Sequence, residues 1–179
     1  LWTGGTVQVS AGYVSGGSSR KGCGGTAIVV TDGSRVTADY AIGGHASSTA
    51  MLAGDGVVVF GEGASAAVMR AVGGESDLGF GGAAVVTQYG GKAEVEQAFG
   101  GDGALEAGKA ALTGYQGGAI SVTSPLDGTL LETKKRIGTA ATVATDGALI
   151  AALCFESWDR SAIMSCTGAM MAGWELSST

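Results

Sequence analysis

The sequence predicts an α+β fold in which two layers of helices enclose stacked β-sheets. Alternating apolar and polar residues predict strands in the first and last thirds of the chain. In the middle third, and again near the end, apolar residues recur at helical spacing. The resulting order of strands, helices, strands, helices and a final strand favours a layered sandwich over a parallel βαβ array.

The first two strands are expected to form a β-hairpin. Residues 26–31 and 35–41 both alternate, and the intervening Asp32-Gly33 is a strong turn signal. A buried strand is predicted at residues 57–60, which are bounded by glycines. Stretches rich in glycine and serine are interpreted as connections, at residues 15–19 and 43–48.

Helices are predicted where alanine and other apolar residues follow a helical period. The first comes directly after Gly61-Glu62-Gly63. The predicted helices cover residues 64–72, 92–99, 104–112, 148–155 and 161–171. Further strands are predicted at residues 83–86, 119–123, 129–133 and 136–140, and from residue 174.

Composition narrows the classes of function. A chain of 179 residues fits one domain, and a net charge of −6 gives little support for a nucleic-acid partner. No apolar run approaches the ~18 residues that span a bilayer, and the first residues do not resemble a signal peptide. Three cysteines without a Cys-x-x-Cys pair, and a single histidine, argue against a disulfide framework and a zinc site. A soluble, intracellular protein is expected.

Glycine usage is unusual. The chain has 34 glycines, against roughly 13 at average usage, and a single proline. Because glycine adds backbone entropy to the unfolded state, such a chain needs many stabilising contacts around its glycines.

Four ordered segments resemble the proteasome subunit family, which has the N-terminal-nucleophile hydrolase fold. These segments are Gly25-Thr26-Ala27-Ile28-Val29-Val30 with Asp39; Val59-Phe60-Gly61-Glu62-Gly63-Ala64-Ser65-Ala66; Ser124-Pro125-Leu126-Asp127-Gly128-Thr129 with Glu132 and Ile137-Gly138-Thr139-Ala140; and Trp174-Glu175-Leu176. The resemblance implies a four-layer α-β-β-α sandwich of two antiparallel sheets flanked by helices. It also implies a leader over residues 1–25 and a single domain over residues 26–179.

The α-type branch of the family is favoured. Gly5-Thr6-Val7-Gln8-Val9, followed by Lys21-Gly22, is similar to the α-type leader. This likeness implies a non-catalytic subunit of the outer ring, which gates substrate entry to a threonine-protease chamber for ATP-dependent, ubiquitin-type protein degradation. The implied partners are other α-type subunits, β-type subunits, regulatory caps and unfolded protein substrates, with no nucleic acid, membrane or cofactor. The implied location is cytoplasmic, and also nuclear in a eukaryote.

The alternative is a β-type threonine endopeptidase in uncleaved or inactive form. The resemblance then makes Thr26 the nucleophile, Asp39 the strand-end acid and Thr139 a supporting hydroxyl, whereas the α-type interpretation has no catalytic residue. An N-terminal threonine needs a free amine and a nearby lysine. No lysine occurs between Lys21 and Lys92, so Thr26 is better interpreted as a strand residue.

Two other patterns have simpler interpretations. His45 suggests a Ser/His/Asp triad because the chain also offers Ser47, Ser48 and Ser76-Asp77, but a solvated loop histidine is favoured. Gly61-Glu62-Gly63 suggests a phosphate loop, but a tight turn is favoured because a third glycine and a lysine are missing.

A third class of protein, outside the proteasome family, is a glycine-rich extracellular β protein. Ring assembly or an antiparallel sandwich with flanking helices would exclude it.

Overall fold

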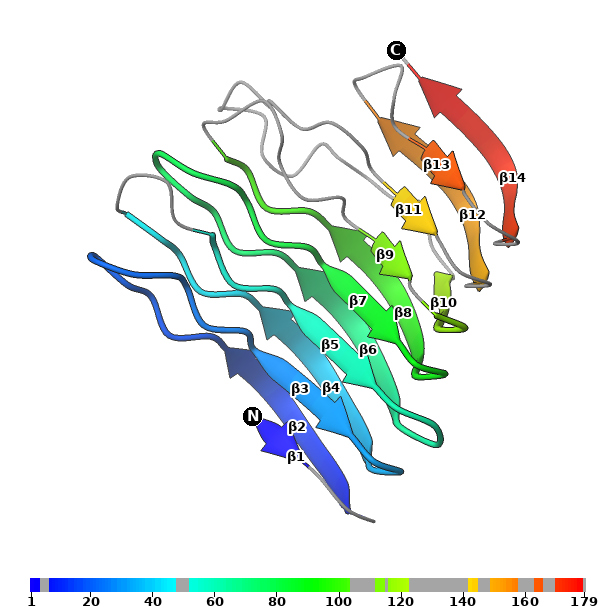
Figure 1. Cartoon of the computed structure of the whole chain (residues 1–179), viewed down its shortest axis with the longest axis horizontal. Coiled ribbons are helices and arrows are strands. Elements are labelled where there is room, and N and C mark those ends of the chain that lie inside the picture. Colours follow the sequence, from blue (N-terminus) through cyan, green and yellow to red (C-terminus); the bar gives the residue numbers. More distant parts are fainter. Residues whose placement is uncertain are drawn as a thin grey trace.

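In the part of the chain that the structure describes, all regular elements are β-strands, which run parallel in two stacked sheets (Figure 1). The computed structural model describes residues 1–3, 7–47, 52–103, 112–114, 116–122, 142–144, 149–157, 163–165 and 170–178. Every regular element in these residues is a strand. Consecutive strands alternate between the two sheets, so the chain winds as a β-solenoid.

Each coil contributes one strand to each sheet. The short-strand sheet has the order β1 (Trp2–Thr3), β3 (Ile28–Thr31), β5 (Val57–Phe60), β7 (Val85–Gln88), β9 (Leu112–Gly114), β11 (Thr142–Ala144) and β13 (Ile163–Ser165). The long-strand sheet has the order β2 (Gln8–Ser15), β4 (Arg35–Ile42), β6 (Ser65–Val72), β8 (Lys92–Phe99), β10 (Ala119–Val122), β12 (Leu149–Ser157) and β14 (Met170–Ser178).

The predicted α+β fold, with its antiparallel α-β-β-α sandwich, is therefore wrong. Asp32-Gly33 is a turn, with φ of 49° and 74°, but it leads from one sheet to the other and does not fold β4 back onto β3. Val29 pairs in parallel with Val58 of the next coil, and Val36 with Ala66. A two-residue turn fits this sheet-to-sheet corner as well as it fits a hairpin, which is why the local signal misled.

The helices predicted at residues 64–72 and 92–99 are also wrong, because these residues form β6 and β8. Their inward residues are spaced by two and then by three: Ala66, Val68 and Ala71 are buried in β6. Regular pairing skips Met69, which marks a bend where two consecutive residues face outward. This bend inserts an i, i+3 spacing into a strand, and that spacing mimics a helical period. The later predicted helices include residues of β12, β13 and β14, while residues 104–111 lie outside the described residues.

The core lies between the two sheets and is built from stacked, mostly β-branched or small side chains. Ile28, Val30, Val57, Val59 and Val85 point inward from the short strands and are fully buried. Alanines and valines of the long strands cover them from the other side. Parallel strands covered by a second layer are expected to be rich in such residues.

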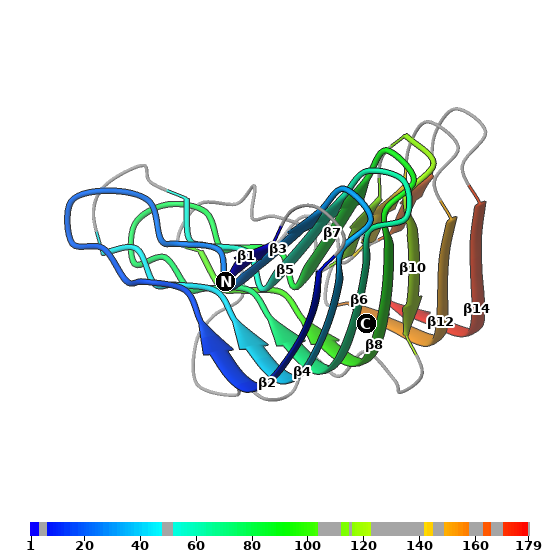
Figure 2. The same cartoon turned by 90° about the horizontal axis from the view of Figure 1, so that it is seen from below.

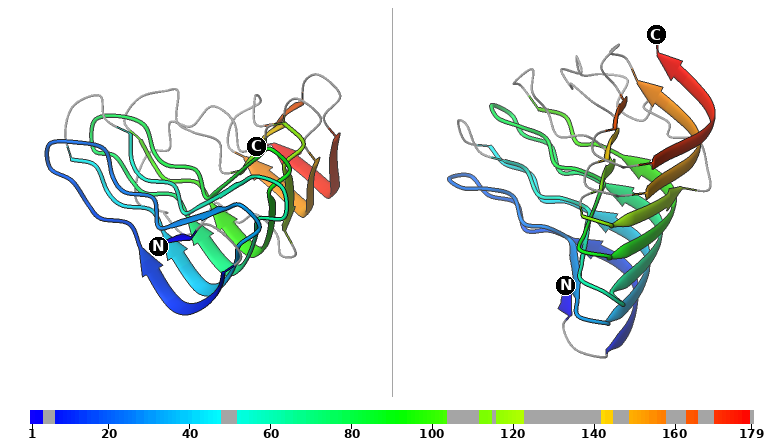
Figure 3. Two further views of the ribbon diagram at one scale, coloured as in Figure 1. Left: turned by 60° about the horizontal axis from the view of Figure 1, so that its bottom comes forward. Right: turned by 45° about the vertical axis from the view of Figure 1, so that its right-hand side comes forward.

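Three connections extend from the sheets as narrow arms, whose described residues are 16–27, 43–47 with 52–56, and 73–84. Figure 2 shows them leaving the long strands on one side of the molecule and returning to the short strands, and Figure 3 shows them lying one above another. Isolated parallel bridges, Ser19 to Ala46 and Ala46 to Ser76, keep neighbouring arms in register.

A ladder of glycine backbones holds the arms together where they meet the sheets. Outgoing and returning segments alternate along one chain of hydrogen bonds: Gly25 N to Gly17 O, Gly44 N to Gly25 O, Gly54 N to Gly44 O, Gly74 N to Gly54 O, Gly82 N to Gly74 O and Gly101 N to Gly82 O, each 2.8–2.9 Å. A Cβ atom on Gly54 would overlap the carbonyl oxygen of Gly25. The large number of glycines is therefore explained in part by backbones that approach too closely for any side chain.

Candidate functional site

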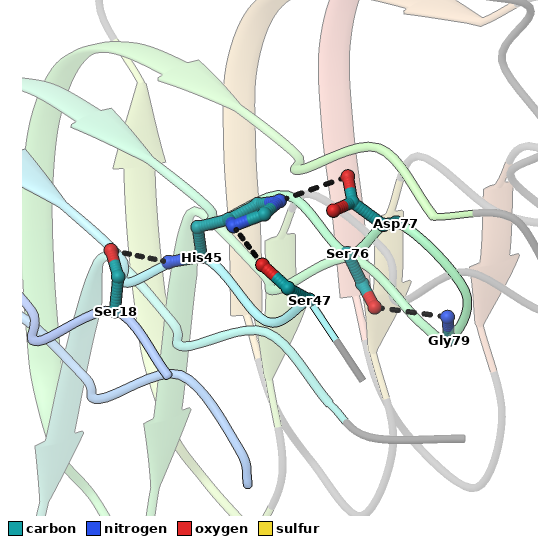
Figure 4. A network of polar contacts seen from close by, with 6 residues as sticks. All are labelled: Ser18, His45, Ser47, Ser76, Asp77 and Gly79. Carbon is teal, nitrogen blue, oxygen red and sulfur yellow. Dashed lines mark hydrogen bonds and ion pairs between the residues drawn. The ribbon is translucent and has the colours of Figure 1, made fainter. Parts of the chain in front are cut away.

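A polar network on the arms is the best-defined cluster of chemically active side chains among the described residues. The Nε2 atom of His45 lies 3.0 Å from a carboxylate oxygen of Asp77, and the Nδ1 atom lies 3.2 Å from the Ser47 hydroxyl (Figure 4). A single tautomer satisfies both contacts: Nε2–H donates to Asp77, and the Ser47 hydroxyl donates to Nδ1. The Ser18 hydroxyl accepts a hydrogen bond from the His45 backbone N–H at 3.4 Å.

The register of the arms brings these residues together. The Ala46 N–H donates to the Glu75 carbonyl, and the Asp77 N–H donates to the Ala46 carbonyl, both at 3.0 Å. Ala46 is fully buried between the arms, whereas His45 and Ser47 on either side of it are partly exposed. Asp77 and His45, which belong to neighbouring coils, thus face each other across the joint between two arms.

The network contains the three residue types of a hydrolytic triad, but its side chains are exposed to solvent. In a triad, the histidine accepts the serine proton while the carboxylate orients the ring, and catalysis depends on donors that stabilise the oxyanion in a site from which water is excluded. Here the side chains of His45 and Asp77 are 35% and 50% exposed, so water competes for both contacts. The arrangement joins two neighbouring coils at the surface and is poorly suited to supporting a charged intermediate.

The sequence prediction for this cluster was partly right. The structure brings Ser47, His45 and Asp77 together, which the favoured interpretation of a solvated loop histidine did not include. Ser76 is buried and instead accepts a hydrogen bond from the Gly79 N–H at 2.9 Å. Ser48 lies outside the described residues.

The residues expected of a threonine protease lie on separate parts of the fold. Thr26 is partly exposed on the returning part of an arm, two residues before β3 in the short-strand sheet. Asp39 is exposed at the bend of β4 in the long-strand sheet. Thr139 lies outside the described residues. Residues 1–25, predicted to be a leader, contain β1 and β2, which pair with β3 and β4.

The segment Gly61-Glu62-Gly63 forms the turn between β5 and β6. Gly61 and Gly63 have φ values of 96° and 75°, and the element that follows is a strand. A phosphate loop uses the N–H groups and dipole at the start of a helix, so this segment lacks the geometry of such a loop.

A shallow groove crosses the outer face of the long-strand sheet over four coils, a feature that the sequence reasoning missed. Its volume is about 380 Å³. It is lined by Ser10, Ala11, Thr37, Ala38, Asp39, Ala67, Val68, Met69, Glu94, Val95 and Glu96. The signal that could have revealed it is the repeat itself: the Gly-Gly pairs that directly follow the first four long strands begin at residues 16, 43, 73 and 100, spaced by 27, 30 and 27 residues.

Other site classes find no support in the part of the chain that the structure describes. No group of three or more His, Cys, Asp or Glu residues in it could hold a metal ion. It contains no helix long and apolar enough to cross a membrane.

No protein-family model matches the chain, and no curated protein or solved structure shows significant similarity to it.

Proposed function

We propose that this chain is a structural module, a stiff β-solenoid spacer that holds its outer faces in a regular array, and that it is not itself an enzyme. The observation that carries this proposal is the parallel, in-register pairing of successive coils in both sheets. Each coil contacts mainly its two neighbours, so such a stack gains length by adding coils without changing the packing of the others.

Two further features support a mechanical role. The glycine ladder adds a third line of backbone hydrogen bonds, parallel to the two sheets and outside their core. The His45–Asp77 contact then joins neighbouring arms beyond that ladder. Because of these contacts, each arm is bonded to the arm of the neighbouring coil, as each strand is bonded to its neighbour in the sheet.

The proteasome role stays a prediction. The site residues that it implied depend on a sandwich fold, whereas the described residues form a solenoid. The glycine-rich β protein considered as a third class is the prediction closest to this proposal, because the antiparallel sandwich that would exclude it is not formed by the described residues.

Removing one whole coil tests the proposal. Deletion of residues 57–84 joins Gly56 to Val85, which is the register partner of Val57. A modular spacer should remain folded, should unfold cooperatively, and should shorten along its axis by about one strand spacing, ~4.8 Å. Far-UV circular dichroism, urea unfolding and small-angle scattering measure these three properties.

The matched control deletes residues 61–84, which joins Phe60 directly to Val85 and removes β6 with its arm. This variant should lose its cooperative transition, because β5 and β7 then follow each other with no strand of the long-strand sheet between them. If the whole-coil deletion unfolds as completely as the control, the chain is not modular and the proposal is wrong.

Catalysis by the arm network is tested separately. We expect the parent and Ser47→Ala to hydrolyse an activated acetate ester at the same slow rate, with Ser18→Ala as the control. A loss of activity of tenfold or more in Ser47→Ala alone would show a working nucleophile and would overturn the non-enzymatic part of the proposal.

A further inference from the structure

Rows of side chains run along the stack of coils on the outer face of the long-strand sheet, where the groove lies. Ser10, Thr37 and Ala67 are register partners in three consecutive coils, and all three line the groove. Glu94 follows them in the next coil. Because the first three side chains are short, an elongated ligand can approach the sheet along the direction of the stack.

The groove also contains carboxylates that have no partner within the described part of the chain. Asp39, Glu94 and Glu96 line the groove, and none of them makes a hydrogen bond or an ion pair with another described residue. Their oxygens are therefore free to accept hydrogen bonds from a ligand. Three cations on the same strands balance these charges, so β2, β4, β6 and β8 together carry no net charge: Arg35, Arg70 and Lys92.

Two exposed tyrosines lie beside the groove. Tyr40 directly follows Asp39 at the bend of β4, and Tyr13 of β2 is its register partner. Their ring centroids are 6.3 Å apart, and the residues are 39% and 63% exposed. A tyrosine combines a flat apolar ring with a polar hydroxyl group, so this pair suits a ligand that has both apolar and polar surfaces.

These features restrict the class of ligand. β4 and β6 are paired on both sides, so an extended peptide finds no free backbone groups there with which to form a further strand. The carboxylates repel the phosphate groups of a nucleic acid or a lipid. Because the four strands carry no net charge, they provide no long-range attraction for a basic polypeptide. A chain of neutral sugars fits best, since it offers many hydroxyl groups and apolar C–H faces.

We infer that the groove binds a neutral polysaccharide that lies along the stack. The tyrosine rings contact the C–H faces of the sugars, and the carboxylates accept hydrogen bonds from sugar hydroxyls. Successive coils repeat at about 4.8 Å, so a polymer can make contacts on several coils. Aromatic surface with a few orienting polar groups is typical of small-molecule sites. The inference rests on the groove and its border, and it does not require the chain to act as a spacer.

Affinity electrophoresis of the intact chain, through gels that contain a soluble neutral polysaccharide, tests this inference. The probes are hydroxyethyl cellulose, xyloglucan, galactomannan and dextran, and at least one of them should retard the protein. Tyr40→Ala should weaken this binding at least tenfold, because it removes a ring beside the groove. Tyr89→Ala is the matched control and should bind like the parent, since Tyr89 is 48% exposed but lies in the turn after β7.

A second variant fills the groove without changing its charge. Ala67→Ile adds bulk to the groove floor with a residue that favours strands, and it should also weaken binding at least tenfold. Circular dichroism shows whether each variant keeps the fold of the parent. Retardation by none of the four polysaccharides overturns the inference. So does retardation that folded Tyr40→Ala and Ala67→Ile leave unchanged, because the polysaccharide would then bind another surface.

The salt dependence of binding separates a neutral ligand from a charged one. Binding of the polysaccharide should change little between about 0.05 and 0.5 M salt, because the ligand carries no charge to be screened. Octalysine is the competing probe. If octalysine binds more tightly than every polysaccharide and loses that binding at high salt, the groove is a site for basic peptides and the inference is wrong.

Discussion

Thr87 is a fully buried polar residue among the apolar, inward-facing residues of the short strands. Its hydroxyl has no hydrogen-bond partner among the described residues, and the side chain is 0% exposed. The register places it beside Val59, which in turn stands beside Val30. Thr87→Val should therefore raise the free energy of unfolding, by about 1–2 kcal/mol, since it removes a buried unpaired hydroxyl without changing the volume.

Urea unfolding measures this change, and Thr37→Val is its control. Thr37 is exposed on the outer face of β4, so its replacement should change stability little. An equal effect of the two substitutions would mean that valine acts through strand propensity and not through burial.

The contact between His45 and Asp77 should contribute little to stability. Both side chains are more than a third exposed, and exposed ion pairs contribute about 0.2–1 kcal/mol. A double-mutant cycle with His45→Ala and Asp77→Asn should give a coupling free energy within this range. A coupling of several kcal/mol would mean that the network is shielded from water, contrary to its exposure.

The glycine ladder makes a sharp prediction for the arms. Gly54→Ala should destabilise the protein by about 1–3 kcal/mol, because its Cβ would overlap the Gly25 carbonyl and overpack the joint. Gly17→Ala is a matched control in the same ladder, since a Cβ there would meet nothing within 4 Å. Thermal unfolding of the two variants measures the difference, and equal melting temperatures would contradict the close packing.

At the level of the elements, alternation predicted most of the first strands correctly. Residues 26–31, 35–41 and 57–60 contain β3, most of β4 and β5. The same reasoning failed for β6 and β8, because their bends place two consecutive residues outward and break the period of two. To predict a bent strand from the sequence, one must know which residues of the neighbouring coil pair with it, and a single segment does not contain this information.

At the level of the whole molecule, the arrangement of strands could not be deduced from local signals. Asp32-Gly33 predicts a turn but does not show which sheet the following strand joins. A sheet-to-sheet corner and a hairpin require similar residues. The recurrence of Gly-Gly at intervals of 27–30 residues carried the information about coils, but the pairs at residues 16 and 43 were interpreted only as parts of connections. For the same reason the contact of His45 with Asp77, 32 residues away, was not expected.

The solenoid itself is tested most directly by disulfide cross-linking between neighbouring coils. Thr37 and Ala67 are register partners on the outer face of the long-strand sheet. Their Cα atoms should therefore be about 4.8 Å apart, within reach of a disulfide. Glu94 is in the same row one coil further on, and at about twice that distance from Thr37 it is out of reach.

With Cys23, Cys154 and Cys166 replaced by serine, oxidised Thr37→Cys/Ala67→Cys should form an intramolecular disulfide, identified by mass spectrometry of the digested protein. Thr37→Cys/Glu94→Cys should remain reduced under the same conditions. An absent bridge in the first pair, or a bridge in the second, would contradict a parallel stack of coils in this register.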